Sequence, residues 1–136
     1  MALEWSPIFS VGVPELDRDH MALMAMINEI ENKIGSGYHL GAMIEKYCGE
    51  MARHAAREVA VLERYGYAGH GEMATAHATL VTQFENFRAA AASGEVARTA
   101  KAWLEYQSLW ISVLTSVSMD YRRYFVANRI VPVVDP

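Results

Sequence analysis

Five side chains that normally lie at protein surfaces occur in hydrophobic surroundings in this sequence. They are three histidines, a glutamate and an aspartate: His20, His54, Glu58, His77 and Asp120. Each lies on or beside the apolar stripe of a predicted helix. Burying such groups without a partner is unfavourable, and imidazoles and carboxylates from several helices can satisfy one another by sharing a metal ion. The pattern therefore predicts a metal site in the core of a helical protein.

The spacing of His54 and Glu58 is the most specific part of this pattern. Residues four apart on a helix point the same way, one turn apart, so both side chains could bind one ion. His20 lies near the start of its predicted helix, His77 in the first half of another, and Asp120 towards the end of the last. In a bundle of antiparallel helices these positions coincide in height, so that the five residues could form one site.

Each candidate also has a purely structural interpretation. His77 taken alone is more typical of a core histidine with one hydrogen bond. Asp120 precedes two arginines by two and three residues, so a surface salt bridge is nearly as compatible with the sequence as metal ligation. Glu58 is harder to explain in this way, because a carboxylate is rarely buried unless it is paired. Only the combination of these residues favours a metal.

Four long helices must position these residues. Hydrophobic residues recur at three- and four-residue steps over about 17–34, over about 39–65, from the glycine-rich turn 66–71 to Ser93, and over about 95–128. Long helices with short connections are typical of an all-α, up-down-up-down antiparallel four-helix bundle. Prolines and glycine in 1–14 predict an extended N-terminal arm, and 129–136 a non-helical tail.

The composition excludes several classes of protein. The 136 residues, 52% of them hydrophobic and 21% charged, predict one globular domain over 1–136. A net charge of −4 gives no basic field that would attract nucleic acid or anionic lipid. The single cysteine, Cys48, rules out an internal disulfide and suits a reducing compartment. We therefore expect a cytoplasmic protein that binds neither nucleic acid nor membrane.

The last predicted helix is apolar nearly all round at its middle, where Leu109, Ile111 and Met119 widen the stripe. Such a collar predicts either deep burial or contact with another subunit, and hence a possible homo-oligomer. The uncharged stretch 109–119 is too short to cross a bilayer. We interpret it as buried helix.

The order of the motifs resembles that of the hemerythrin family. The shared features are Trp5, the segment Phe9-Ser10-Val11-Gly12-Val13, Leu16-Asp17 with His20, His54-x-x-x-Glu58, the turn Gly66-Tyr67, and Tyr121 and Tyr124 after Asp120. The resemblance covers nearly the whole chain and is similar to the bacterial, single-domain members. It implies a four-helix bundle with two non-haem irons, bridged by a glutamate, an aspartate and a small oxygen ligand, and reversible binding of dioxygen.

The resemblance also implies a role for each candidate ligand. His20 and His54 would be terminal ligands of one iron, and His77 a ligand of the other. Glu58 and Asp120 would be the carboxylates that bridge the two. Two imidazoles with a carboxylate and open positions also resemble the ligand sets that suit a single Fe(II).

Two expected histidines of the second iron are missing. Met73 and Thr115 stand where the family has imidazoles. His70 could replace one of them, but the glycines on either side favour a turn, and a register based on Gln107 would place a serine where the aspartate belongs. On a regular helix Thr115 would point away from Asp120, and only a local widening would bring both inward.

Three functions are compatible with these residues. We expect a hemerythrin-like, non-haem iron-binding protein that is not an enzyme, holds one iron or two, and binds dioxygen or another small diatomic ligand. The alternative is a metal-free bundle that acts as an interaction or dimerisation module. An open mononuclear iron could also reduce peroxide or nitric oxide, although no separate acid, base or substrate cleft is evident.

Overall fold

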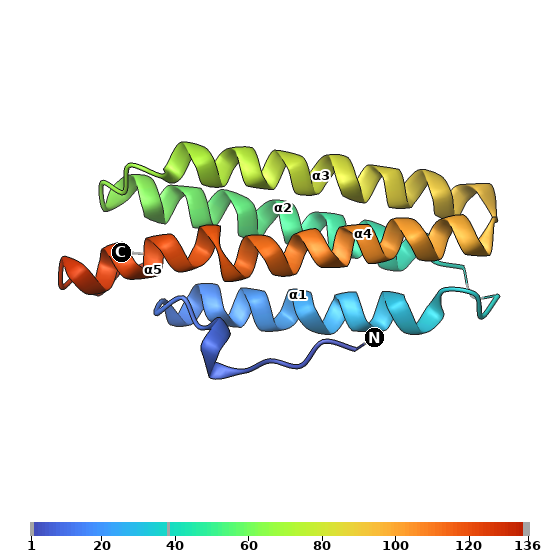
Figure 1. Cartoon of the computed structure of the whole chain (residues 1–136), viewed down its shortest axis with the longest axis horizontal. Helices are drawn as coiled ribbons and strands as arrows, with labels where there is room; N and C mark the ends of the chain where they lie inside the picture. The colour runs from blue at the N-terminus through green and yellow to red at the C-terminus, as the bar shows by residue number, and fades with distance from the viewer. Residues whose placement is uncertain (1, 38, 135–136) are drawn as a thin grey trace.

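The computed structural model describes residues 2–37 and 39–134, and every long element in them is a helix (Figure 1). The elements are the 3-10 turn η1 Pro7–Phe9, α1 Pro14–Lys33, α2 Gly41–Arg64, α3 His70–Ser93, α4 Val96–Thr115 and α5 Val117–Ala127. No strand occurs among these described residues. The all-α class predicted from the sequence is thus confirmed, and the helices pack side by side as a bundle, α1 on α2, α2 on α3 and α3 on α4.

The helix ends follow local rules of backbone chemistry. Pro14 begins α1, where its missing N–H has no partner to lose. Gly94 follows α3 with φ 76°, the left-handed conformation that glycine adopts without strain. The first two helices end within one residue of their predicted ends and begin two or three residues from their predicted starts, which is the usual uncertainty of helix boundaries.

The prediction of one continuous helix over 95–128 is wrong. Ser116 has φ −120° and ψ −73°, and it separates α4 from α5. Next to this break the Thr115 hydroxyl donates to the Ile111 carbonyl at 2.8 Å, and the Ser116 hydroxyl donates to the Ser112 carbonyl. Serine and threonine hydroxyls that bond to the preceding turn tend to bend helices. The hydrophobic period runs through the break, which is why periodicity alone did not reveal it.

Side-chain hydrogen bonds attach both terminal segments to the helices. Asn28 of α1 accepts from the Leu3 amide at 2.7 Å and donates to the Leu3 carbonyl at 2.8 Å. Arg64, at the end of α2, donates to the carbonyls of Val133 and Val134 at 2.6 and 2.8 Å. Residues 1 and 135–136, which belong to the predicted arm and tail, lie outside the described residues.

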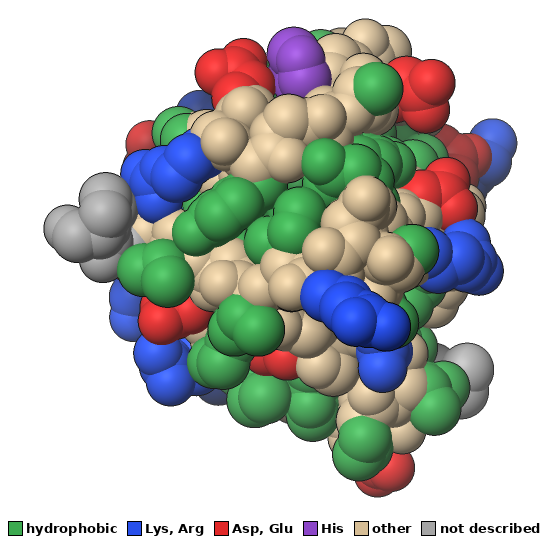
Figure 2. Space-filling view, turned by 90° about the vertical axis from the view of Figure 1, so that its left-hand side faces the viewer, with side chains coloured by type: hydrophobic (Ala, Val, Ile, Leu, Met, Phe, Trp, Pro, Cys, Tyr) green, Lys and Arg blue, Asp and Glu red, His purple; other side chains and the backbone are tan. Residues whose placement is uncertain are grey.

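The surface carries scattered hydrophobic groups. Figure 2 views the end that lies at the left of Figure 1, where hydrophobic side chains gather among charged ones. Among the described residues Val131 is 85% exposed and Val126 is 70% exposed. Leu109, Ile111 and Met119, which form the apolar collar predicted from the sequence, are partly buried and pack against the core. None of the described helices has the length and hydrophobicity needed to cross a membrane.

Candidate metal centre

Glu58 of α2 is the centre of a buried polar cluster. Only 1% of this residue is exposed. Its Oε1 is hydrogen-bonded to Nε2 of His77 at 2.8 Å and lies 3.4 Å from Nε2 of His54. Its Oε2 accepts a hydrogen bond from the Tyr121 hydroxyl at 2.7 Å and lies 3.4 Å from Nε2 of His20. Both carboxylate oxygens therefore have two polar neighbours each.

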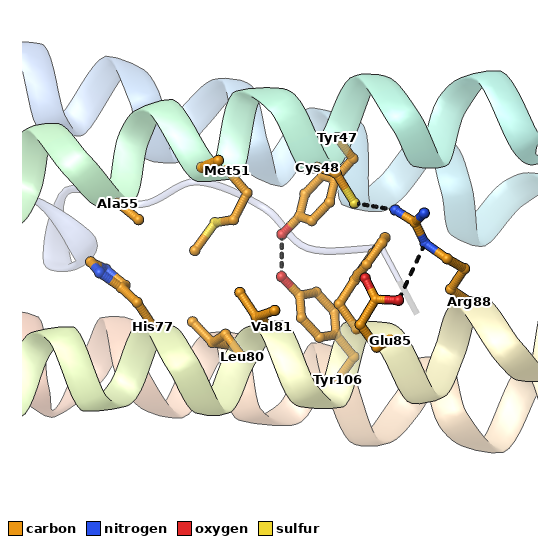
Figure 3. A pocket seen from close by; sticks show the side chains of 12 residues that line it. Tyr47, Cys48, Met51, Ala55, His77, Leu80, Val81, Glu85, Arg88 and Tyr106 are labelled. Atoms are coloured by element: carbon orange, nitrogen blue, oxygen red, sulfur yellow. Dashed lines mark hydrogen bonds and ion pairs between the residues drawn. The ribbon is translucent and has the colours of Figure 1, made fainter.

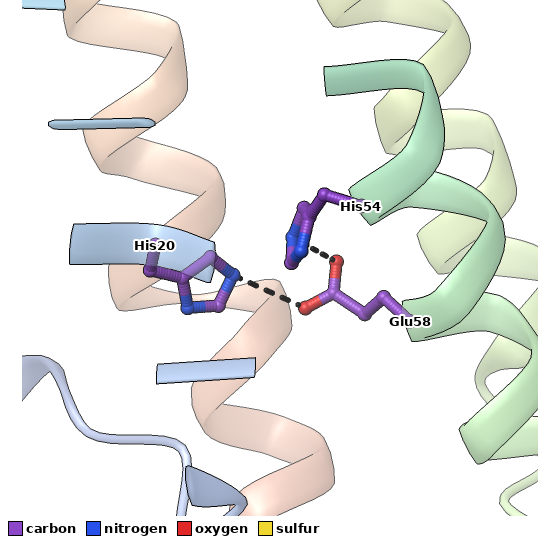
Figure 4. Close-up of side chains that lie close together, drawn as sticks. All are labelled: His20, His54 and Glu58. Atoms are coloured by element: carbon purple, nitrogen blue, oxygen red, sulfur yellow. Dashed lines mark ion pairs between the residues drawn. The ribbon is translucent and has the colours of Figure 1, made fainter. Parts of the chain in front are cut away.

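The helices bring these groups together in a simple way. His54 and Glu58 are one turn apart on α2 and point the same way, and His20 of α1 points towards the same carboxylate (Figure 4). His77 reaches it from α3 and Tyr121 from α5. Four of the five residues singled out from the sequence thus lie at one level of the bundle.

Asp120 is the exception, and its expected place in the site requires correction. Its side chain is 57% exposed and forms an ion pair with Arg123 at 2.7 Å, the alternative that the sequence had left open. The reason is the phase of α5, which buries Ser118, Tyr121 and Phe125 and so turns Asp120 outwards. Thr115 is exposed as well, so the break in the helix does not bring both residues inward.

The second position that lacks an expected histidine, Met73, is occupied by a core side chain. Met73, which stands one turn before His77, is fully buried and belongs to the hydrophobic core. At a helical position a methionine surrounded by apolar side chains acts as a gap-filler. Hence neither Met73 nor Thr115 supplies a group to the cluster around Glu58.

The geometry of the cluster fits a metal ion. His20, His54 and Glu58 each offer one ligand atom, and these three atoms lie within 4.8 Å of one another. Ligand atoms about 2.1 Å from a shared ion lie roughly 3.0–3.4 Å apart. Nε2 of His54 lies 3.4 Å from Oε1 of Glu58, and Nε2 of His20 lies 3.4 Å from Oε2, so an ion between the imidazoles would be close to both carboxylate oxygens. A cavity of about 20 Å³ adjoins all three side chains, which is room for about one water molecule or ion.

Asp19 contacts His54 on the side of the imidazole ring that faces away from Glu58, and it was not among the residues predicted from the sequence. Its Oδ2 lies 3.0 Å from Nδ1 of His54, which leaves Nε2 facing Glu58. A carboxylate behind a ligating histidine typically fixes the orientation of the ring. Asp19 is only 7% exposed, and Arg53 and Arg57 of α2 lie 3.4 and 3.6 Å from its Oδ1. Its position beside His20 in the sequence was the available signal.

Tyr121 was also missed as a site residue, although its place on an apolar stripe was predicted. Burial, together with the charge of Glu58, raises the pKa of Tyr121 well above its ordinary value. The phenol therefore stays neutral and serves as a hydrogen-bond donor to the carboxylate. By contrast, Nδ1 of His20 is buried and has no hydrogen-bond partner among the described residues.

The two central groups are ionised in the absence of a metal. Burial opposes the charge on His54, but Glu58 and Asp19 outweigh it and raise the pKa of the imidazole to about 9. Burial likewise opposes the charge on Glu58, but His54, His20 and His77 hold its pKa well below the usual value. A metal ion at Nε2 of His54 must therefore displace a proton.

Comparison with known proteins adds no identification. No family model matches the chain, and neither a curated protein nor a solved structure matches it. The resemblance to hemerythrins rests on the motifs in the sequence, and the candidate metal centre rests on the geometry around Glu58.

Proposed function

We propose that this chain is a hemerythrin-like protein that binds one non-haem iron ion through His20, His54 and Glu58. The observation that carries the proposal is the mutual approach of three ligand atoms within 4.8 Å in the interior of the bundle. Two histidines and one carboxylate are the ligand set typical of mononuclear Fe(II) sites with open positions. His77, hydrogen-bonded to the same carboxylate at 2.8 Å, is the candidate fourth ligand.

One ion fits the side chains better than two. Among residues 2–37 and 39–134, only this group of three or more histidine, cysteine or acidic side chains approaches closely enough to hold a metal. Of the described residues, Glu58 is the only carboxylate that lines the small cavity, and the α4 and α5 residues there are Trp110, Val113, Leu114 and Ser118. A second ion would lack the imidazoles expected at Met73 and Thr115, and it would lack a second carboxylate.

The residues around the cavity also define what the site can bind. The ion would supply open coordination positions, and the cavity of about 20 Å³ would hold the ion itself. Because a cavity of this size takes only about one water molecule or ion, a ligand bound to the ion must be small, such as dioxygen or another diatomic molecule. Asp19 holds His54 in orientation, and Tyr121 holds Glu58.

The proposal includes the architecture expected of such a protein. An up-down-up-down order is supported by the short connections between consecutive helices and by the packing of each helix on the next. An N-terminal arm is supported by the bonds between Leu3 and Asn28. A cytoplasmic location is consistent with the free thiol of Cys48.

Metal analysis tests the proposal directly. Protein purified without oxygen and loaded with Fe(II) should retain about one iron per chain. Replacing Glu58→Ala should abolish retention, whereas Glu63→Ala, at an exposed position of the same helix, should leave it unchanged. Two irons per chain would contradict the mononuclear site, and retention by the Glu58 variant would show that the site lies elsewhere.

A metal-free interaction module is the second candidate. It is favoured by one observation, namely that Glu58 has partners without a metal, because it is matched by protonated His54 and by the Tyr121 hydroxyl. If no iron, zinc or manganese binds under any loading condition, this candidate replaces the first. Sedimentation of the metal-free chain would then show whether the partner is a second copy.

A further inference from the structure

A second, larger cavity of about 250 Å³ lies between α2 and α3. Its inner wall is formed by the buried side chains of Tyr47, Phe84 and Tyr106, and exposed Val81 and Glu85 line its mouth (Figure 3). His77 and Leu80 line one end. The walls are thus mainly apolar, and the cavity is open to solvent on one side.

Two phenols in this wall leave one proton without a partner. The hydroxyls of Tyr47 and Tyr106 are hydrogen-bonded to each other and are both buried. Together they carry two protons, whereas a contact between two oxygens uses one. Neither hydroxyl has another hydrogen-bond partner in the described part of the chain. Because the pair meets at the cavity (Figure 3), the spare O–H can be satisfied by an acceptor inside it.

The charges at the other end of the cavity do not favour an anion. Arg88 donates to Glu45 at 2.9 Å and to the Cys48 sulfur at 2.8 Å. Its Nε lies 3.6 Å from Glu85. Two carboxylates thus offset one guanidinium, and a negatively charged ligand would meet net repulsion. An uncharged molecule remains the best match.

Volume and polarity narrow the ligand further. An apolar protein cavity of roughly 150 Å³ is known to hold one benzene molecule, so about 250 Å³ accommodates one ring with a short substituent. A water molecule in the inner, apolar part of the cavity would be a poor occupant, because water needs about two to four polar partners and the wall formed by Tyr47, Phe84 and Tyr106 offers the one spare donor of the phenol pair. The occupant should carry one acceptor on an otherwise apolar body.

We propose that this cavity binds a small, uncharged aromatic molecule with one carbonyl group, whose oxygen accepts the spare proton of the Tyr47–Tyr106 pair. The proposal goes beyond iron binding and does not depend on it, since neither tyrosine belongs to the metal cluster. The phenols are suited to the role because burial raises the pKa of both, which keeps them neutral donors.

Two probes of the same shape test the hydrogen bond. Acetophenone has a carbonyl oxygen where α-methylstyrene has a methylene group. Calorimetric titration of the purified protein should give an affinity for acetophenone that is higher by roughly fivefold to tenfold, the effect of about one hydrogen bond. Equal affinities would overturn the proposal, as would failure of both probes to bind.

Cavity variants test the location. Ala55 lines the cavity and points into it (Figure 3), so Ala55→Leu should weaken acetophenone binding by at least tenfold. Ala56→Leu, at an exposed position outside the lining, is the matched control and should bind as the original chain does. If both variants weaken binding equally, or if neither weakens it, the ligand binds outside this cavity.

Tyrosine variants test the donor. In Tyr47→Phe or in Tyr106→Phe the remaining hydroxyl has lost its acceptor, so its proton is free and the preference for acetophenone should persist. The double variant has no donor, and the preference should disappear. A preference that survives in the double variant, or is lost in either single variant, contradicts the assignment. If the double variant does not fold, the single variants and the probe pair still decide.

Discussion

Two layers of the bundle bury polar atoms, and the groups that pair in them differ in kind. Around Glu58 the polar groups are ionisable and come from α1, α2, α3 and α5. In the aromatic layer, Tyr47, Phe84, Phe87, Trp103 and Tyr106 pack ring against ring, with centroids 4.7–6.0 Å apart. Its only hydroxyls are neutral and pair with each other.

This difference shows how each layer responds to change. A charge in the first layer depends on charged partners on its own and on neighbouring helices, so that the loss of one partner leaves another buried charge with fewer partners. A ring in the second layer depends on volume and contact, and a lost hydroxyl removes one neutral hydrogen bond. The first layer is therefore the fragile one, and it is also the one able to exchange a proton for a metal ion.

The largest contrast should appear when one polar group is deleted from each layer. In metal-free protein, Glu58→Leu should lower the free energy of unfolding by up to about 3–5 kcal/mol, because protonated His54 keeps only Asp19 as a charged partner and the Tyr121 hydroxyl loses its acceptor. Tyr106→Phe should lower it by no more than about 1 kcal/mol. Urea denaturation measures both.

The double variant Glu58→Leu, His54→Leu sharpens this comparison. Replacing both ends of a buried ion pair by apolar groups is much less harmful than replacing one, so this variant should be more stable than Glu58→Leu alone. If it is less stable, the two residues do not form an ion pair in the folded protein.

A smaller effect should appear in the dependence of stability on pH. The pKa of His54 is raised from 6.5 to about 9, so the folded metal-free protein binds this proton more tightly than the unfolded chain. The resulting stabilisation is fully present below about pH 6.5 and is lost as pH rises through about 9, by at most roughly 3–4 kcal/mol. Urea midpoints measured at intervals across this range give the slope.

Two variants show which of the two layers causes this dependence of stability on pH. His54→Gln should flatten it. The double variant Tyr47→Phe, Tyr106→Phe should retain it, because burial raises the pKa of both phenols further above this range. A slope that persists in His54→Gln would show that another group titrates.

The smallest effect is expected outside both layers, at Asp120. Its exposed ion pair with Arg123 is worth roughly 0–1 kcal/mol, so Asp120→Ala should change stability by no more than that and should leave iron retention unchanged. Iron analysis of this variant distinguishes the exposed Asp120 of the structure from the bridging ligand that the resemblance to hemerythrins implies. Loss of iron would mean that the side chain of Asp120 faces the ion in the iron-bound protein.

The sequence predicted the parts of the site that depend on one helix at a time. His20, His54, Glu58 and His77 lie on apolar stripes, and a stripe identifies the buried face of its own helix. Asp19 escaped notice because its importance comes from His54 on a neighbouring helix, which periodicity does not report. The hydroxyl pair of Tyr47 and Tyr106 was not predictable for the same reason, since the residues are 59 positions apart.

Asp120 was misplaced for a different reason. The buried residues Trp110, Leu114, Ser118, Tyr121 and Phe125 keep one helical period across Ser116, and Asp120 lies at the edge of that stripe, so the stripe alone does not bury it. Its expected place in the site came from the resemblance to the hemerythrin family. The all-α class did not depend on that resemblance and was predicted correctly.

The break at Ser116 lies just before the turn of α5 that contains Asp120. An inserted residue at this break would therefore change which side chains of α5 face Glu58. Successive helical residues are about 100° apart, and Asp120 directly precedes Tyr121, the residue that donates to Glu58. Inserting one residue at the break would carry Asp120 into the place of Tyr121. A site with one carboxylate would thereby gain a second, with no ligand residue substituted. The junction between α4 and α5 is thus a place where a change in chain length alone would alter the set of side chains around the site.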